Sequence, residues 1–277
     1  MSGEVSKATI KARRSHLVIL EKYTYTAGAI EPLPKHAHQE YQFGVSWHRL
    51  GEFYYRGAYQ RIPQGDLAIL QSGEMHIPNQ SGFIPTPAVY WMMYVEPDTL
   101  QAIANELTER PTALPFFPLP SIAQPALIQL FLQLHQVMDQ AHTQLEHDVL
   151  LNQLFTHLLT HHALDCPPPR PLRSAQNAVG RACEFLQDHC AEDVSLQTLA
   201  DYVQLSPSYL RRAFNQEMKI SPHVYQMQIR IGHAKRLLLQ KKSIAEVASL
   251  TGFYDQSHFG QQFKRWVGVT PGLYRCQ

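Results

Sequence analysis

The sequence has few cysteines and no long hydrophobic run, and these absences narrow the class of protein. The 4 cysteines among 277 residues show none of the paired spacings of a zinc site, and a chain of this length does not need disulfides to fold. Residues 1–16 are polar and lack the apolar core of a signal peptide, and no later segment approaches the roughly 18 apolar residues of a membrane helix. We therefore expect a cytoplasmic protein with reduced thiols and no membrane partner.

Motifs for common enzyme chemistry are also missing. No nucleophile triad, phosphate-binding loop or dinucleotide fingerprint stands out in the sequence. The length of 277 residues accommodates two ordinary domains, each with its own hydrophobic core. We therefore expect a two-domain protein that is not an enzyme and needs no cofactor.

The net charge of +1 conceals an asymmetry along the chain. Residues 1–170 carry 11 Lys and Arg against 15 Asp and Glu, a net −4, whereas residues 171–277 carry 13 against 8, a net +5. A charge excess is most often a solvated face, and it attracts a polyanion only where the fold aims it at phosphates. Only the second part of the chain therefore has the charge that nucleic-acid binding requires.

A proline-rich stretch separates the two parts. Residues 166–171 read CPPPRP, which cannot continue a helix and favours an extended, semi-rigid spacer. We predict an N-terminal domain over residues 1–165, a linker over 166–173 and a C-terminal domain over 174–277.

The N-terminal part itself changes character near residue 96. Residues 16–95 are rich in Val, Tyr, Phe and Trp in short alternating runs, with turn signals at Pro63–Gly65 and Ser72–Gly73, and predict the strands of a small barrel or sandwich. Residues 97–164 have helical spacing and predict two amphipathic helices. The apolar stripes of these helices are Leu127, Leu130, Phe131, Leu134, Val137 and Met138, and Leu150, Leu151, Leu154, Phe155, Leu158 and Leu159.

After the linker the sequence repeats itself at an offset of 48 residues early and 49 residues late. The matched positions are Ser195-Leu196 with Ser243-Ile244, Leu199-Ala200 with Val247-Ala248, Leu210 with Phe259, Phe214 with Phe263, Ser221-Pro222 with Thr270-Pro271, and Tyr225 with Tyr274. Each copy has a serine cap, a short helix, a tight turn, a second helix, and then a cap with proline that starts the next helix. Any helical domain shows stripes and caps, but two matched copies favour two helix-turn-helix units.

The run from Ser195 to Arg275 resembles the AraC/XylS family of bacterial transcription regulators almost throughout. The most specific positions are Leu205-Ser206 with Tyr209-Leu210, Arg230 with Ala234 and Leu237-Leu238, Ile244 to Gly252-Phe253, and Phe259, Phe263-Lys264, Thr270-Pro271 and Tyr274-Arg275. The N-terminal part is similar to the cupin-type sensor domains of this family in the order of His36-Ala-His38, Tyr41-Gln42, Pro63–Asp66 and Gly73–His76. The resemblance implies an N-terminal cupin-like β-barrel with following helices, and an all-α C-terminal domain of two helix-turn-helix units joined by a long helix.

A recognition helix reads base edges in the major groove with its N-terminal half. In the first copy, burial of the apolar positions turns the polar ones outward, so the predicted DNA-binding residues are Ser206, Pro207, Ser208, Arg211, Arg212 and Asn215. The two arginines are the best candidates because guanidinium binds guanine or phosphate through two hydrogen bonds, although a solvated pair is the alternative.

In the second copy, burial of Phe259 and Phe263 predicts a corresponding DNA-facing set. These residues are Gln256, Ser257, His258, Gly260, Gln261 and Lys264. Many family members have a small hydroxyl residue and an arginine where this chain has Gly260 and Gln261, so the resemblance implies weaker contacts by this unit. Glutamine still reads adenine, so sequence preference survives.

One helix is predicted between the two copies, over residues 222–240. At 1.5 Å per residue it is about 28 Å long, close to one duplex turn, which suits entry of both recognition helices into successive major grooves. By resemblance, Arg230 on this helix ties the two units together through an acidic partner rather than touching DNA.

The β-rich part contains a candidate sensor site. In cupins, His-x-His, a following acid and a later His gather metal ligands inside a barrel. Here His36, His38 and His76 are present but Gln42 or Phe43 occupies the place of the acid, so we favour an organic-ligand or structural role over a metal site. The predicted ligand-binding residues are His36, His38, Tyr41, His76 and Trp91, of which Tyr41 and Trp91 also suit a core.

These features favour a ligand-responsive transcription regulator, of the activator type usual in the family. We expect it to bind promoter DNA at the bacterial nucleoid as a homodimer, to respond to a small organic effector and to act on RNA polymerase. The stripe of Leu127, Leu130, Leu134 and Met138 forms the dimer contact or packs on its own barrel. The alternatives are a metal-dependent cupin enzyme with a helical appendage and a ligand-independent DNA-binding protein.

Overall fold

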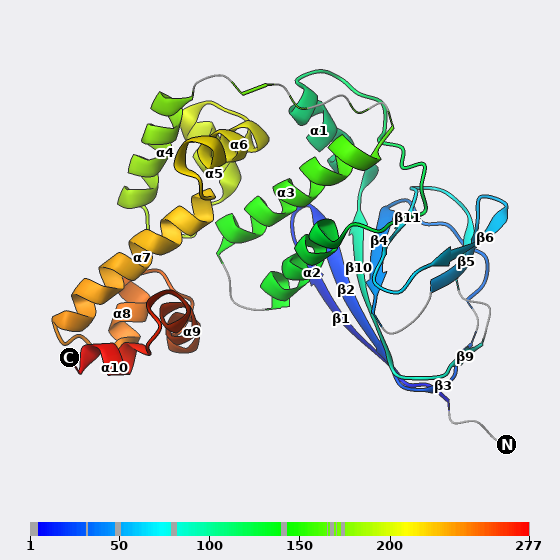
Figure 1. Cartoon of the computed structure of the whole chain (residues 1–277), viewed down its shortest axis with the longest axis horizontal. Helices are drawn as coiled ribbons and strands as arrows, with labels where there is room; N and C mark the ends of the chain where they lie inside the picture. Colours follow the sequence, from blue (N-terminus) through cyan, green and yellow to red (C-terminus); the bar gives the residue numbers. More distant parts are fainter. Residues whose placement is uncertain are drawn as a thin grey trace. The chain divides into compact units, whose positions relative to one another are not determined.

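The computed structural model describes residues 5–31, 33–47, 51–78, 82–139, 143–164, 166, 169, 171–172 and 175–276 (Figure 1). The chain divides into two compact units, one of Met1–Gln136 with Leu154–Arg170 and one of Val137–Gln153 with Pro171–Gln277. Residues 137–153 group with the helical unit, whereas the domain boundaries predicted at 1–165, 166–173 and 174–277 stay predictions. Half of the predicted linker, 166–173, lies outside the described residues.

The first unit is built on antiparallel sheets. The strand orders are β1-β2-β10-β4-β7-β11 in a six-stranded sheet, β6-β5-β8 in a three-stranded sheet and β3-β9 in a two-stranded sheet. The strands are β1 Ala8–Arg14, β2 Val18–Tyr25, β3 Gly28–Ala29, β4 Tyr41–Ser46, β5 Gly51–Tyr55, β6 Ala58–Ile62, β7 Leu67–Leu70, β8 His76–Pro78, β9 Phe83–Ile84, β10 Ala88–Val95 and β11 Ser121–Ile122. In the part of the chain that the structure describes, these sheets do not join into one closed barrel, so the expected barrel is an open cupin-like arrangement.

The central strands show why this sheet has one core face and one open face. Alternate side chains of a strand point to opposite faces, and Phe43 of β4 is opposite both Met93 of β10 and Ile69 of β7. All three of these side chains are buried. Tyr90, Met92 and Tyr94 alternate with them along β10 and line a cavity on the other face.

Three helices accompany this sheet, where the sequence predicted two. They are α1 Pro97–Thr108, α2 Pro125–Asp139 and the second half of α3 Gln144–His162. The stripe considered for a dimer contact packs largely inside its own chain, because Leu127 and Leu134 are buried and Leu130 and Met138 are half-buried.

The second unit is helical. After the first half of α3 it contains α4 Gln176–Asp188, α5 Leu196–Val203, α6 Pro207–Met218, α7 Pro222–Leu239, α8 Ile244–Leu250, α9 Gln256–Val267 and α10 Pro271–Arg275. One apolar cluster includes residues of α4, α5 and α6, and another includes residues of α7, α8 and α9. The two predicted helix-turn-helix units are thus α5-α6 and α8-α9, and α7 joins them.

Five predicted caps are in place, whereas Ser221, predicted to cap α7, makes no side-chain capping bond and its hydroxyl contacts the ring of His223. The side chains of Ser195, Ser206, Ser243, Asp255 and Thr270 each accept a hydrogen bond from the backbone amide three residues later, which satisfies a free helix-terminal donor. Among the described residues, no helix has the length and apolar character needed to cross a bilayer.

Candidate functional sites

Helix α6 occupies the place of the first recognition helix. Its inner face of Leu210, Ala213 and Phe214 is buried, as predicted. However, Ser208 and Arg211 are only 1% and 6% exposed, so the expectation that both face outward is wrong for this structure. The physical reason is that the first half of α3 covers them.

Asn152 of α3 makes the contact that covers α6. Its Oδ1 accepts a hydrogen bond from Nε of Arg211 at 2.7 Å, and its Nδ2 donates to Oγ of Ser208 at 2.7 Å. Burial, with a smaller effect of the charge of Arg212, lowers the pKa of Arg211 to about 10. The guanidinium of Arg211 is thus desolvated beside a second cation.

The other predicted residues of α6 are more accessible. Pro207, Arg212 and Asn215 are half-buried. The Nε of Arg212 donates to the carbonyl of Ser208 at 3.3 Å, and its guanidinium lies 5.6 Å from the ring centre of Tyr209. Its cationic side chain is only half-buried, which suits a phosphate contact.

Helix α9 occupies the place of the second recognition helix and is more open. Gln256, Ser257, Gln261 and Lys264 are exposed, whereas His258 and Gly260 are half-buried. The side chain of Asp255 caps α9, because its Oδ1 accepts a hydrogen bond from the backbone amide of His258 at 2.7 Å. Sequence reasoning missed Tyr254, which is 80% exposed directly before this helix. Its position in the turn, with no periodic neighbour, gave no signal.

Arg230 on α7 ties the two helix-turn-helix units together through backbone carbonyls, and the nearby charge of Asp193 favours its charged form. Its side chain is 1% exposed and donates to three carbonyls: Cys190 at 2.6 Å, Glu192 at 2.9 Å and Gly252 at 2.8 Å. The first two carbonyls precede α5 and the third lies in the turn before α9. The hydrogen bonds that link the two units go to carbonyls, and the acidic residue Asp193 acts on Arg230 through its charge.

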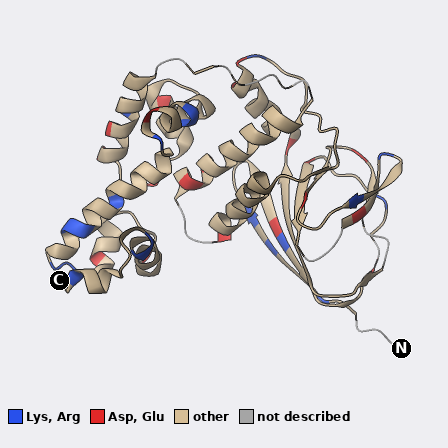
Figure 2. Ribbon diagram, in the orientation of Figure 1, with Lys and Arg blue, Asp and Glu red and all other residues tan. Residues whose placement is uncertain are grey.

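Basic side chains lie along α7 and α9 of this unit, as Figure 2 shows. Lys264 and Arg265 form the exposed last turn of α9, and Lys241 follows α7 and donates to the carbonyl of Arg275 at 2.8 Å. These cations give the helical unit a surface that can attract phosphates.

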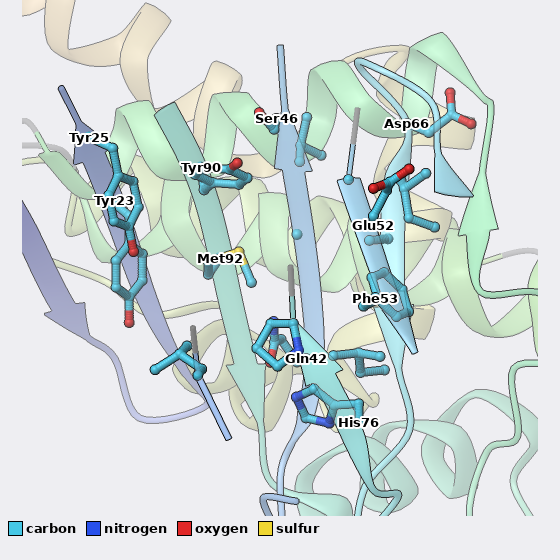
Figure 3. Close-up of a pocket in the computed structure, with 18 of the residues that line it drawn as sticks. Tyr23, Tyr25, Gln42, Ser46, Glu52, Phe53, Asp66, His76, Tyr90 and Met92 are labelled. Carbon is cyan, nitrogen blue, oxygen red and sulfur yellow. The ribbon is translucent and has the colours of Figure 1, made fainter. Parts of the chain in front are cut away.

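The first unit contains a cavity of about 360 Å³ beside the six-stranded sheet (Figure 3). Strands β2, β4, β5 and β10 contribute half of the residues that line it. The lining includes Tyr23, Tyr25, Phe53, Tyr90 and Tyr94 as the aromatic part and Gln42, Ser46, Glu52, Asp66, His36 and His76 as the polar part. Such a volume and lining are typical of a site for a small organic ligand.

Two of the five predicted ligand-binding residues line this cavity, namely His36 and His76, whose rings lie 4.4 Å apart. The ring of His38 lies 5.0 Å from that of His76, and its Nε2 shares a hydrogen bond with Oε1 of Gln42 at 2.7 Å, so it supports the lining.

Tyr41 and Trp91 lie away from the cavity. Tyr41 is 1% exposed, and its hydroxyl donates to the carbonyl of Pro115 at 2.7 Å. Trp91 alternates with the cavity-lining Tyr90 and Met92 and lies 5.6 Å from Nζ of Lys22. Because alternate side chains of a strand point to opposite faces, Tyr41 and Trp91 lie on the face of the sheet away from the cavity.

The two ends of the cavity differ in their polar groups. Glu52 and Asp66 lie toward one end, and Gln42 and His76 lie toward the other (Figure 3). Burial raises the pKa of Asp66 and lowers the pKa of His76, so burial favours the uncharged form of each. Among the described residues, no three His, Cys, Asp or Glu side chains are placed to hold a metal ion together.

A β-rich domain with a ligand-sized cavity, joined to two capped helix-turn-helix units, defines a two-part regulator. Residues 199–277 match the helix-turn-helix domain family, and residues 23–159 match the AraC-like ligand binding domain family. The uncharacterised helix-turn-helix-type transcriptional regulator YbfI of Bacillus subtilis is 30% identical over 241 residues, which cover 86% of this chain and 85% of that protein. The chain therefore belongs to the AraC/XylS family of transcription regulators.

Two further relatives in sequence agree with this assignment. The transcriptional activator RhaS of an Enterobacter species is 25% identical over 88% of this chain and 90% of its own, and the arabinose operon regulatory protein of Salmonella typhimurium is 28% identical over 76% and 75%. The solved C-terminal domain of AraT from Geobacillus stearothermophilus is 35% identical, covers 38% of this chain and 87% of its own, and has a TM-score of 0.35. The protein is thus a DNA-binding transcription regulator with a ligand-binding domain, and the family is not one of enzymes.

Proposed function

We propose that this protein is an effector-responsive transcription activator. A small organic molecule binds in the cavity of the first unit and changes the binding of promoter DNA by α6 and α9. The observation that carries the proposal is the equivalent place of these two capped helices in two repeats of one chain that also contains a ligand-sized cavity. The name of one relative, a transcriptional activator, supports control of transcription in the positive direction.

The proposed DNA contacts differ between the two helices. On α6 they come from Pro207, Ser208, Arg211, Arg212 and Asn215, while Ser206 caps the helix. On α9 they come from Gln256, Ser257, His258, Gly260, Gln261 and Lys264. The arginines of α6 can form bidentate, charge-assisted hydrogen bonds to guanine or phosphate, whereas the glutamines of α9 can form hydrogen bonds to adenine. We therefore expect α6 to supply more of the affinity and α9 more of the sequence preference.

The proposed partners follow from family membership. We propose that the protein works as a homodimer, contacts RNA polymerase and acts at the bacterial nucleoid, where its DNA lies. Leu127 and Leu134 are buried within the chain, which supports a dimer contact that does not depend on these two residues. Sedimentation of the full chain at micromolar concentration, alone and with DNA, tests for the dimer. A protein that stays monomeric in solution and binds each DNA site as one copy would contradict it.

The charge of the cavity favours an uncharged or cationic effector over an anionic one. Carboxylates of Glu31, Glu52 and Asp66 line it, and the described lining includes no lysine or arginine. An anion would lie beside these carboxylates without a described cation, whereas an ammonium or hydroxyl group would compensate the half-buried Asp66. Calorimetric titration with an acid, an alcohol and an amine on one aromatic skeleton tests this, and preference for the acid would contradict it.

Genome-wide mapping of bound sites tests the function as a whole. We expect the protein to occupy promoters in cells. We also expect its binding to a DNA fragment from such a site to change when the compound processed by the products of the neighbouring genes is added. If the protein binds the DNA fragment equally with and without that compound, and Asp66→Asn also leaves DNA binding unchanged, the ligand-independent alternative is favoured. Absence of occupied sites would overturn the proposal.

A further inference from the structure

The first half of α3, residues 144–153, packs inside the helical unit, and we call it the cover segment. Leu145 and Val149 belong to the same apolar cluster as Leu199, Leu210 and Phe214 of the first helix-turn-helix unit, and both are buried. The cover segment is therefore held against the DNA-binding unit by a shared hydrophobic core.

Polar contacts fix the register of the cover segment. The backbone amide of Gln144 donates to Oδ1 of Asp193 at 2.8 Å, and Oδ2 of Asp148 accepts from the backbone amide of Leu196 at 3.0 Å. Asp148 is 8% exposed. Its carboxylate is held by the backbone amide at the start of α5. These bonds place the next turn of α3, with Asn152, over α6.

Asn152 then occupies the side chains that α6 would present to DNA. It bonds Nε of Arg211 and Oγ of Ser208, each at 2.7 Å, and leaves them 6% and 1% exposed. A duplex cannot contact side chains that are covered in this way, because phosphate and base contacts require direct or water-mediated approach. A neutral amide also holds the cation less strongly than a phosphate or guanine could.

We propose that the cover segment is an autoinhibitory lock on the first recognition helix, and that residues 144–153 leave α6 before Ser208 and Arg211 contact DNA. The proposal rests on the proposed role of α6 in reading DNA. The same helix continues into the pocket-bearing unit, where Leu154, Phe155, Leu158 and Leu159 are buried. One continuous helix thus contains both the lock and part of the core of the sensing unit.

Two substitutions at Asn152 test the lock because they should act in opposite directions. Asn152→Ala removes both bonds to α6 and should tighten DNA binding, whereas Asn152→Asp pairs a carboxylate with Arg211 and should weaken it, each by about five-fold. Gln153 is the exposed next residue on α3, so Gln153→Ala and Gln153→Glu are matched controls for size and charge and should change little. A residue that only maintains the fold would weaken binding in both Asn152 variants.

The measurement uses the full-length chain without added effector, at one fixed salt concentration. The probe is a duplex enriched from a random-sequence library by the unaltered protein, and thermal unfolding confirms that each variant is folded. Asn152→Ser serves as a second loosening variant if Asn152→Ala unfolds. Weaker binding in the loosened variant, or no difference between the Asn152 variants and their Gln153 controls, overturns the lock.

Failure of the lock and failure of the proposed function are separated by Arg211→Ala in the Asn152→Ala background. If this second change weakens binding while Asn152→Ala alone does not tighten it, α6 reads DNA and the lock is overturned. If Arg211→Ala changes nothing in that background, Arg211 does not contact DNA, and both the proposed contact and the lock on it are overturned.

Discussion

At the scale of single residues, burial sets the protonation of His135 on α2. The side chain is 7% exposed, its ring lies 4.9 Å from that of Phe131, and burial, with a smaller effect of Lys22, lowers its pKa to about 4. An unfolded histidine titrates near pH 6.5, so as the pH falls from 6.5 toward 4 the unfolded chain takes up a proton that the folded chain does not. This residue therefore makes the fold less stable toward acid.

We predict that His135→Leu reduces the loss of stability between pH 7.5 and pH 5. The unaltered chain should lose about 2 kcal/mol more than the variant over this range, since 1.5 pH units separate pH 5 from the unfolded pKa. Denaturant unfolding of both proteins at the two pH values measures the difference. Equal losses would show that His135 is not buried in its neutral form.

Gly252 lies where neither the backbone conformation nor the surrounding atoms leave room for a side chain. Its φ is +75°, and a Cβ built there would lie 2.2 Å from the carbonyl oxygen of Ala191. Gly268 has a similar φ of +88° but nothing within 4 Å of its Cβ position. We predict that Gly252→Ala costs at least about 2 kcal/mol more stability than Gly268→Ala, because only the first adds a collision to the backbone strain. Chemical unfolding of the two variants decides this, and equal costs would contradict the close approach.

At the scale of elements, helix α7 contains a position where the sequence is not optimal for stability. Gly232 is exposed within α7, and a Cβ there would meet nothing within 4 Å. We predict that Gly232→Ala stabilises the protein by about 1 kcal/mol, because alanine restricts the unfolded chain and favours helix. Thermal unfolding measures the gain, and DNA affinity should stay unchanged. A loss of stability would indicate that α7 bends at this glycine.

The elements also show which features the sequence could predict. Caps and helices were predictable because their determinants are local: Ser206, Asp255 and the start of α7 at Pro222 all act within one turn. The cover over α6 was not predictable, because Asn152 is 56 and 59 residues from its partners. Tyr41 was misplaced for the same reason, since its partner Pro115 is 74 residues away. Helical spacing identifies an outward face but not what packs on it.

At the scale of the whole molecule, the charge asymmetry predicted from the sequence corresponds to the division of roles. Residues 1–170 carry a net −4 and contain the acidic ligand-sized cavity, whereas residues 171–277 carry a net +5 and contain both recognition helices. The negative part repels a polyanion, so long-range attraction to DNA comes from the helical part.

The last prediction follows from this separation and concerns the salt dependence of DNA binding by the full chain. Each cation that neutralises a phosphate releases condensed counterions, so Lys264→Ala should make the slope of log affinity against log salt shallower by about 0.9. Gln261 is exposed on the same helix but neutral, so Gln261→Ala should leave the slope unchanged and relax the preference at one base pair by about 1 to 3 kcal/mol. Titrations of both variants on a matched and a singly mismatched duplex at four salt concentrations separate these effects. An equal change of slope in the two variants would mean that α9 does not present Lys264 to the phosphates.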